Sequence, residues 1–301
     1  MPKEPVAAIL PAIWPSGDAL VPLLIASGSD PYRFASINRS ADAVLEPPLA
    51  LEVWMDTLAI AMVTIGAGAF RGVTGFGYAM VASLGISGAL MLPALSVPFI
   101  LFNDLLLTAF TLLDRKHGPV DWVAGRILLL SGLCGALCGG LLAARLDENI
   151  ARVMVACFVA LAACVALIRN PPGWLASRPF GMLFGFAVGL LLSAFAVGGP
   201  LAAAWLLAGG TQRTHVRGTL AVFFGAIDLA SLVSRLFIGT IDLRLMGLLA
   251  FYCPLTLAGF GVGYLISRHV TPDVWHRISS GGLVLIAAIG LIQAIGALAA
   301  V

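Results

Sequence analysis

Charged residues are scarce in this chain of 301 residues. They make up 11% of it, whereas an ordinary soluble domain contains about 25%. The formal net charge is only +2, so neither a basic surface for nucleic acid nor an acidic tail is predicted. The charges that are present concentrate in the first 53 residues and at short boundaries further along. The long stretches between these boundaries cannot remain in water, and polynucleotide binding is excluded as a first interpretation.

The sequence also lacks the residue patterns of metal centres and disulfide frameworks. Its five cysteines all lie in apolar stretches without the spacing of either kind of site, so we expect them to be small packing residues. They are Cys134, Cys138, Cys157, Cys164 and Cys253. The four histidines lie near the charged boundaries, and no His-Glu-x-x-His or comparable cluster occurs. No metal and no other cofactor is predicted.

Apolar residues, in contrast, make up 60% of the chain. Several apolar stretches approach or exceed the roughly 20 residues that a helix needs to cross a bilayer. We therefore expect an all-α, polytopic membrane bundle of about eight transmembrane helices. The predicted spans are 54–71, 79–113, 121–144, 149–168, 179–197, 200–236, 242–267 and 277–300. Blocks 54–113 and 179–238 could each hold three short spans instead of two, so ten spans are the alternative. Lys and Arg divide evenly between the two sets of loops and leave the orientation open.

The first 53 residues have a different composition. They mix eight prolines with polar residues, and their apolar runs are too short to span a membrane. We expect a non-membrane tail at 1–53. Its basic start is a single Lys3 beside Glu4, and Pro11 interrupts the apolar stretch that follows, which is not the pattern of a signal peptide. Translation from Met55, without this tail, is the alternative.

The remainder of the chain is internally repeated. A shift of 121 residues superposes Gly68 on Gly189, Gly77 on Gly198, Gly118 on Gly239 and Asp121 on Asp242. We therefore expect two homologous membrane repeats, at 54–170 and 179–300. Internal repeats are typical of secondary transporters, whose substrate sites lie at the repeat interface near the middle of the bilayer.

Glycine-rich segments interrupt the first helix of each repeat. One includes Gly75 and Gly77, and the other includes Gly198, Gly199 and Pro200. Glycine tolerates unusual backbone angles and proline donates no amide hydrogen bond, so we expect helices to end and restart at both segments. Helix N-termini that begin there would direct free N–H groups into a buried site, which suits an anion. Close helix packing through small residues is the alternative.

The two glycine segments resemble those of the sulfite exporter TauE/SafE family. The resemblance rests on Gly68 through Gly77, on Gly189 through Leu207 and on Arg217-Gly218-Thr219, and it covers roughly 54 to 300. It implies a multi-pass protein of the bacterial inner membrane, built of two homologous halves, that moves a small sulfur-containing anion such as sulfite or a sulfonate. Phe76 and Tyr78 replace part of the family's usual run of glycines and would narrow the site.

The breaks and the resemblance together give the candidate substrate-binding residues. These are Arg71, Thr74, Gly75, Gly77, Gly198, Gly199, Arg217 and Thr219. Arg71 marks the edge of the membrane, or, if the chain re-enters at Gly72, it presents its guanidinium to the anion.

Asn103, Asp104 and Asp228 are the candidates for proton coupling. They fall within apolar stretches, where an ionisable residue is costly and is by default a functional hypothesis. Under the 121-residue shift Asp104 falls on Gly225, one helical turn before Asp228, so each half places a carboxylate at nearly the same depth. The two carboxylates either pair with an arginine or a hydroxyl and stabilise the bundle, or take up and release the proton that drives transport, with Asn103 as the neighbour of Asp104.

The sequence therefore predicts a secondary transporter or exporter of a small anion, with the anion and the lipid bilayer as its partners. A transporter of another small organic solute and a passive anion channel are the alternatives. No enzymatic activity is predicted, because an intramembrane enzyme needs a catalytic constellation at one depth, and only Asp104 and Asp228 are candidates for one. The substrate, the direction of transport and the oligomeric state are not predicted.

Overall fold

The computed structural model describes residues 47–86, 93–113, 118–143, 173–198, 200–239, 241 and 243–271, together with isolated positions between 274 and 288. Within these residues the regular secondary structure is entirely helical, which confirms the all-α prediction. In chain order the helices are α4 (Pro47–Thr74), α5 (Tyr78–Ile86), α6 (Pro93–Leu113), α7 (Trp122–Ala143), the 3-10 helix η2 (Gly173–Ala176), α9 (Arg178–Phe195), α10 (Pro200–Ala208), α11 (Arg213–Ile238) and α12 (Leu243–Ser267).

Six of these helices, α4, α6, α7, α9, α11 and α12, are long and apolar enough to cross a membrane. The two others, α5 and α10, have nine residues each and are too short to cross it. The predicted spans 79–113 and 200–236 are therefore each divided into a short helix and a long one. The predicted span 149–168 lies outside the described residues, and 277–300 is described only at isolated positions. Helix α4 begins at Pro47, within the predicted tail, and residues 1–46 of that tail also lie outside the described residues.

The order of long and short helices occurs twice. A long helix, a short helix and two long helices form α4 to α7, and the same sequence of lengths forms α9 to α12. A shift of 121 residues carries the end of α4, Thr74, onto the end of α9, Phe195, and the start of α7, Trp122, onto the start of α12, Leu243. Each short helix thus follows the first long helix of its set.

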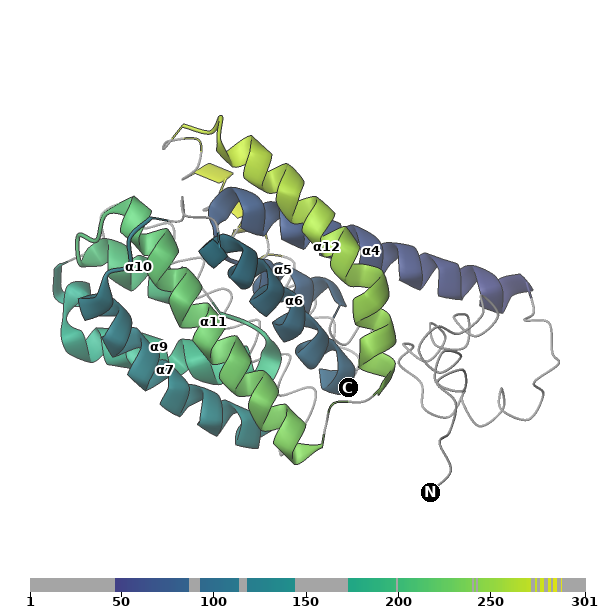
Figure 1. Ribbon diagram of the computed structural model, residues 1–301, viewed down its shortest axis with the longest axis horizontal. Helices are drawn as coiled ribbons and strands as arrows, with labels where there is room; N and C mark the ends of the chain where they lie inside the picture. Colours follow the sequence, from purple (N-terminus) through teal and green to yellow (C-terminus); the bar gives the residue numbers. More distant parts are fainter. Residues whose placement is uncertain are drawn as a thin grey trace, which may run out of the picture.

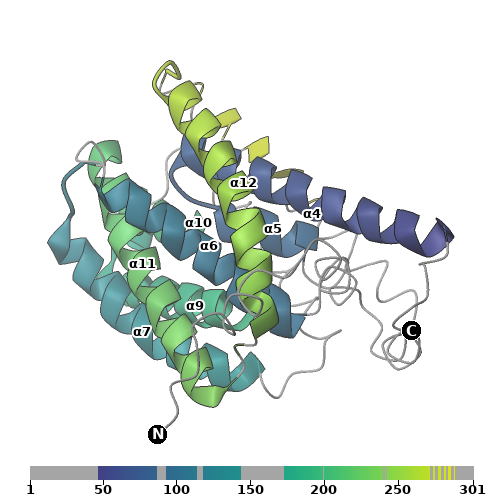
Figure 2. The same ribbon diagram turned by 45° about the vertical axis from the view of Figure 1, so that its right-hand side comes forward.

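The closest helix pairs join elements from different sets. Helix α4 packs along α12, and α7 packs along α9, while α6 and α11 lie between the two pairs (Figures 1 and 2). Glycines allow the backbones to touch: a Cβ atom on Gly68 would collide with the carbonyl oxygen of Thr256, and one on Gly189 with that of Gly132. Small residues at such crossings are typical of helices that pack within a bilayer.

The distribution of polarity is opposite to that of a soluble protein. Large apolar side chains such as Leu113, Val123 and Phe237 are exposed. The charged residues Arg71, Asp104 and Asp228 are instead among the most deeply buried side chains of the bundle. An apolar exterior suits contact with lipid, and charges buried in such a bundle require partners within it.

Replacement of Gly68 by alanine tests the close approach of α4 and α12. We expect G68A to lower the unfolding free energy by about 1–3 kcal/mol, because the added methyl group overpacks the contact with Thr256. The matched control is G66A on the same helix, where nothing lies within 4 Å of the added Cβ and alanine should stabilise by roughly 0.5–1 kcal/mol. Thermal unfolding in detergent measures both, and equal shifts would show that the two helices do not touch at Gly68.

Candidate functional site

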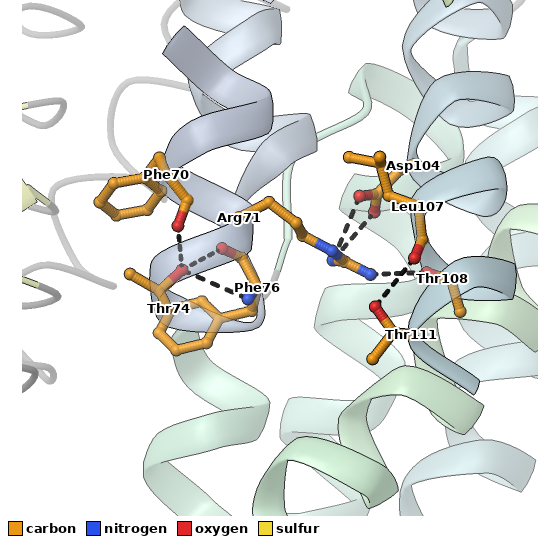
Figure 3. Close-up of polar contacts among 8 residues, drawn as sticks. All are labelled: Phe70, Arg71, Thr74, Phe76, Asp104, Leu107, Thr108 and Thr111. Carbon is orange, nitrogen blue, oxygen red and sulfur yellow. Dashed lines mark hydrogen bonds and ion pairs between the residues drawn. The ribbon is translucent and has the colours of Figure 1, made fainter. Parts of the chain in front are cut away.

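A three-residue break separates α4 from α5. Gly75 and Gly77 have φ angles of 88° and 90°, in the left-handed region that favours glycine. The Thr74 hydroxyl accepts a hydrogen bond from the Phe76 N–H at 3.3 Å and lies 2.8 and 2.6 Å from the carbonyl oxygens of Phe70 and Phe76 (Figure 3). Thr74 therefore closes the turn that ends α4, and α5 restarts at Tyr78.

The second break follows α9. Ala196 takes the left-handed conformation, with φ 55°, and its N–H donates to the Leu192 carbonyl at 2.9 Å. The Val197 N–H reaches back to the Leu191 carbonyl at 3.3 Å, and α10 restarts at Pro200. The prediction that glycine segments interrupt both helices is confirmed. Gly198 packs against the side chains of α9, and Gly199 lies outside the described residues.

Two arginines of α11 hold the ends of both broken helices. Arg217 donates to the Gly72 carbonyl at 3.2 Å, and Arg235 donates to the Ser193 carbonyl at 2.8 Å. These carbonyls belong to the last turns of α4 and α9, where backbone acceptors have no partner within the helix and the helix dipole is negative. Gly72 and Ser193 are related by the 121-residue shift. The same helix therefore stabilises equivalent points of the two breaks.

Arg71 lies in the last turn of α4 and points into the bundle toward α6 (Figure 3). Its side chain is buried, and Nη1 lies 3.1 Å from Oδ1 of Asp104. Nη2 donates to the Thr108 hydroxyl at 2.5 Å, and the guanidinium carbon lies 5.9 Å from the centre of the Phe224 ring. A cation in this position requires an anionic partner, and in the structure that partner is Asp104.

Asp228 brings a second carboxylate to the same point from α11. The helices α6 and α11 touch where Thr108 meets Gly225, and one turn away the carboxyl groups of Asp104 and Asp228 are direct neighbours. Both aspartates are completely or almost completely buried, with exposed fractions of 2% and 0%. We call Arg71, Asp104 and Asp228 the charged triad. It joins α4 and α6 to α11.

Several buried polar atoms around the triad have no hydrogen-bond partner among the described residues. They are Arg71 Nε, Asn103 Oδ1, both carboxylate oxygens of Asp228 and Ser231 Oγ. Such atoms are rare within proteins, because burial without a hydrogen bond costs free energy. They lie on α4, α6 and α11, the three helices that carry the triad, and we call this region the polar centre.

Two other candidates, Thr219 and Asn103, make hydrogen bonds that stabilise the helix framework. Thr219 accepts a hydrogen bond from the Asp121 N–H at 2.9 Å, and Asp121 in turn caps the start of α7 by accepting from the Val123 and Ala124 N–H groups at 3.1 Å each. Asn103 donates its amide N–H to the Phe99 carbonyl of its own helix at 2.9 Å. The structure thus brings Arg71, Asp104 and Asp228 together and places Thr219 elsewhere.

Three residues of this region were not among the sequence candidates: Thr108, Ser231 and Arg235. Thr108 follows Asp104 by four residues and Ser231 follows Asp228 by three, so helical spacing would have placed each on the face of its aspartate. Arg235 carried no such signal, because it reads as an ordinary boundary charge. Within the described residues, no group of three or more His, Cys, Asp or Glu side chains could hold a metal ion.

Comparison with known proteins gives one match. A family model described as "Sulfite exporter TauE/SafE" matches residues 60–291, a range that includes both breaks and the charged triad. No curated protein and no solved structure matches the chain.

Substitution of Thr74 tests its role in the first break. We expect T74V to lower the unfolding free energy by about 1–3 kcal/mol, because the hydroxyl contacts with the Phe76 N–H and with the carbonyls of Phe70 and Phe76 are lost. T64V is the matched control, since the Thr64 hydroxyl only donates to carbonyls of its own helix, at 2.9 Å. We compare both variants by thermal unfolding in detergent. T74S, which keeps the hydroxyl, should restore the stability. Equal losses for the two valine variants would contradict a specific role for Thr74.

Proposed function

Because the chain belongs to the sulfite exporter TauE/SafE family of membrane transport proteins, we propose that it is a secondary transporter of a small sulfur-containing anion, such as sulfite or a sulfonate. The proposal places it in the bacterial inner membrane as a multi-pass protein. The single observation that carries it is the buried Arg71 at the break between α4 and α5. A guanidinium in this position offers a planar set of donors that suits an oxyanion.

The backbone around Arg71 supports the same proposal. The first N–H groups of α5, which begins at Tyr78, have no acceptor within their own helix and carry the positive end of its dipole. Gly75 and Gly77 have no side chains, so none projects from these two positions of the break. In the second break Gly198 and Gly199 would serve the start of α10 in the same way. The anion would thus be held between two helix N-termini and one arginine.

The remaining candidates would position the helix ends at the site or couple transport to protons. Arg217 would hold the end of α4 through the Gly72 carbonyl, and Thr219 would fix the start of α7. Asp104 and Asp228 would take up the proton that couples transport to a proton gradient, and Asn103, whose amide does not titrate, would only assist them as the neighbour of Asp104. Two broken helices in equivalent positions favour alternating access over a passive channel, because each break offers a hinge beside the site.

Flux of radiolabelled sulfite, sulfate, thiosulfate and methanesulfonate into proteoliposomes tests the proposal. We expect R71Q to lower the flux of the transported anion by roughly tenfold or more, since a hydrogen bond to a charged group contributes about 1.5–3 kcal/mol. R126Q is the matched control, because Arg126 lies at an exposed position and donates only to the Trp122 carbonyl of its own helix.

Membrane abundance and thermal unfolding show whether R71Q is folded. Normal flux in folded R71Q would remove Arg71 from the site. Accumulation of the anion against its own gradient distinguishes a secondary transporter from a channel. If wild-type protein moves none of the four anions, the sulfur-anion assignment fails, and carboxylates and neutral solutes become the solutes to test.

A further inference from the structure

The charged triad contains one cationic side chain and two anionic ones. Arg71 is paired with Asp104 across 3.1 Å, and Asp228 lies against Asp104. Asp228 accepts no hydrogen bond from any donor among the described residues. Two ionised carboxylates can only accept hydrogen bonds, so a hydrogen bond between neighbouring carboxyl groups requires a proton on one of them. Asp104 and Asp228 could therefore bond to each other only with one proton between them.

The net charge of the triad also indicates that its two carboxyl groups hold one proton. With both carboxylates ionised the buried triad would carry a net charge of −1, and an uncompensated charge inside a membrane bundle is costly. One shared proton makes the triad neutral. Among the described residues, the other titratable side chains at this point are Tyr78 of α5 and Cys253 of α12, which are neutral in their protonated forms. Arg217 and Arg235, on α11, are directed to backbone carbonyls at the two helix breaks.

An anion that binds Arg71 has to compete with Asp104. Nη1 and Nη2 of the guanidinium already contact Asp104 and Thr108. The third nitrogen, Nε, has no hydrogen-bond partner among the described residues (Figure 3). A second negative charge beside ionised Asp104 would be repelled, whereas a protonated Asp104 no longer requires the arginine. Protonation of both aspartates thus releases the guanidinium and keeps the site neutral once the anion is bound.

We propose that the Asp104–Asp228 pair takes up one proton for each monoanion that binds Arg71, so that one proton and one monoanion cross the membrane together. The inference rests on the proposed function and adds the ratio of protons to anions and their common direction. The proton comes from the water on the side where the anion binds, and it is returned to water with the anion on the other side. The substrate class that fits is a monoanion, such as a sulfonate or hydrogen sulfite, because a dianion would need a second proton.

Simultaneous measurement of anion and proton flux tests the ratio. Wild-type protein in proteoliposomes receives radiolabelled methanesulfonate, which stays a monoanion over the whole pH range, so that only protons of the protein are counted. Trapped pyranine reports internal pH. We expect one proton to enter with each methanesulfonate ion. We also expect methanesulfonate binding in detergent to weaken tenfold for each pH unit above the titration of the pair, as linkage to one proton requires.

Variants of the aspartates separate coupling from binding. In D104N and in D228N one carboxyl group remains to take the proton, so each single variant should keep the one-to-one ratio. The double variant D104N/D228N has no carboxyl group left. It should bind methanesulfonate with an affinity that changes less than twofold between pH 5 and pH 8, and transport should follow the membrane potential instead of the pH gradient. D121N, whose side chain caps α7 outside the triad, is the matched control.

The outcomes are distinguishable. Movement of methanesulfonate by wild-type protein without protons, or an unchanged pH dependence of binding in the double variant, would overturn the inference and leave the proposed transport of a sulfur-containing anion intact. If wild-type protein moves none of the four anions, both fail. Should the double variant not fold, the wild-type ratio of protons to anions still decides, since any ratio other than one contradicts the proposal.

Discussion

The ion pair between Arg71 and Asp104 is the interaction on which the arrangement of the bundle depends. A buried guanidinium inside an apolar helix bundle is tolerated only with an acceptor beside it, and that acceptor fixes α4 against α6. Because Arg71 lies in the last turn of α4, the same pair anchors the end of this helix within the bundle. The Thr108 hydroxyl completes the contact. The break that Thr74, Gly75 and Gly77 form therefore lies beside the polar centre.

Helix α11 supports this centre from the opposite side. It contributes Asp228 to the triad, and two of its arginines, Arg217 and Arg235, neutralise the carbonyl ends of α4 and α9. Arg217 lies near the start of α11 and Arg235 near its end, so one continuous helix connects the two breaks. A displacement of α11 along its axis would therefore act on both breaks at once. Both arginines that bind the helix ends lie on α11, whereas each set of helices contains a break.

Much of this architecture is predictable from the sequence, because hydropathy and glycine position are local properties. Apolar length predicted the spanning helices that the structure describes, and the glycines predicted the breaks after α4 and α9. The partner of Arg71 was not predictable, since Asp104 is 33 residues away and only packing brings it near. The left-handed residue after α9 is Ala196, where glycine would have been expected. The pairing of α4 with α12 likewise depends on the whole bundle.

That pairing has a consequence for biosynthesis. The backbone contact of Gly68 is with Thr256, so the face of α4 that contains this glycine is completed only after nearly all of the described chain has been made. At translation rates of roughly 5–20 residues per second, α4 waits on the order of 10–40 s for its neighbour. Helices α7 and α9 are closer in the sequence, so they can pack together much sooner. Among the described helices, α4 is therefore the first to leave the ribosome and one of the last to reach its final contacts, and until then its Gly68 face meets lipid or the insertion machinery.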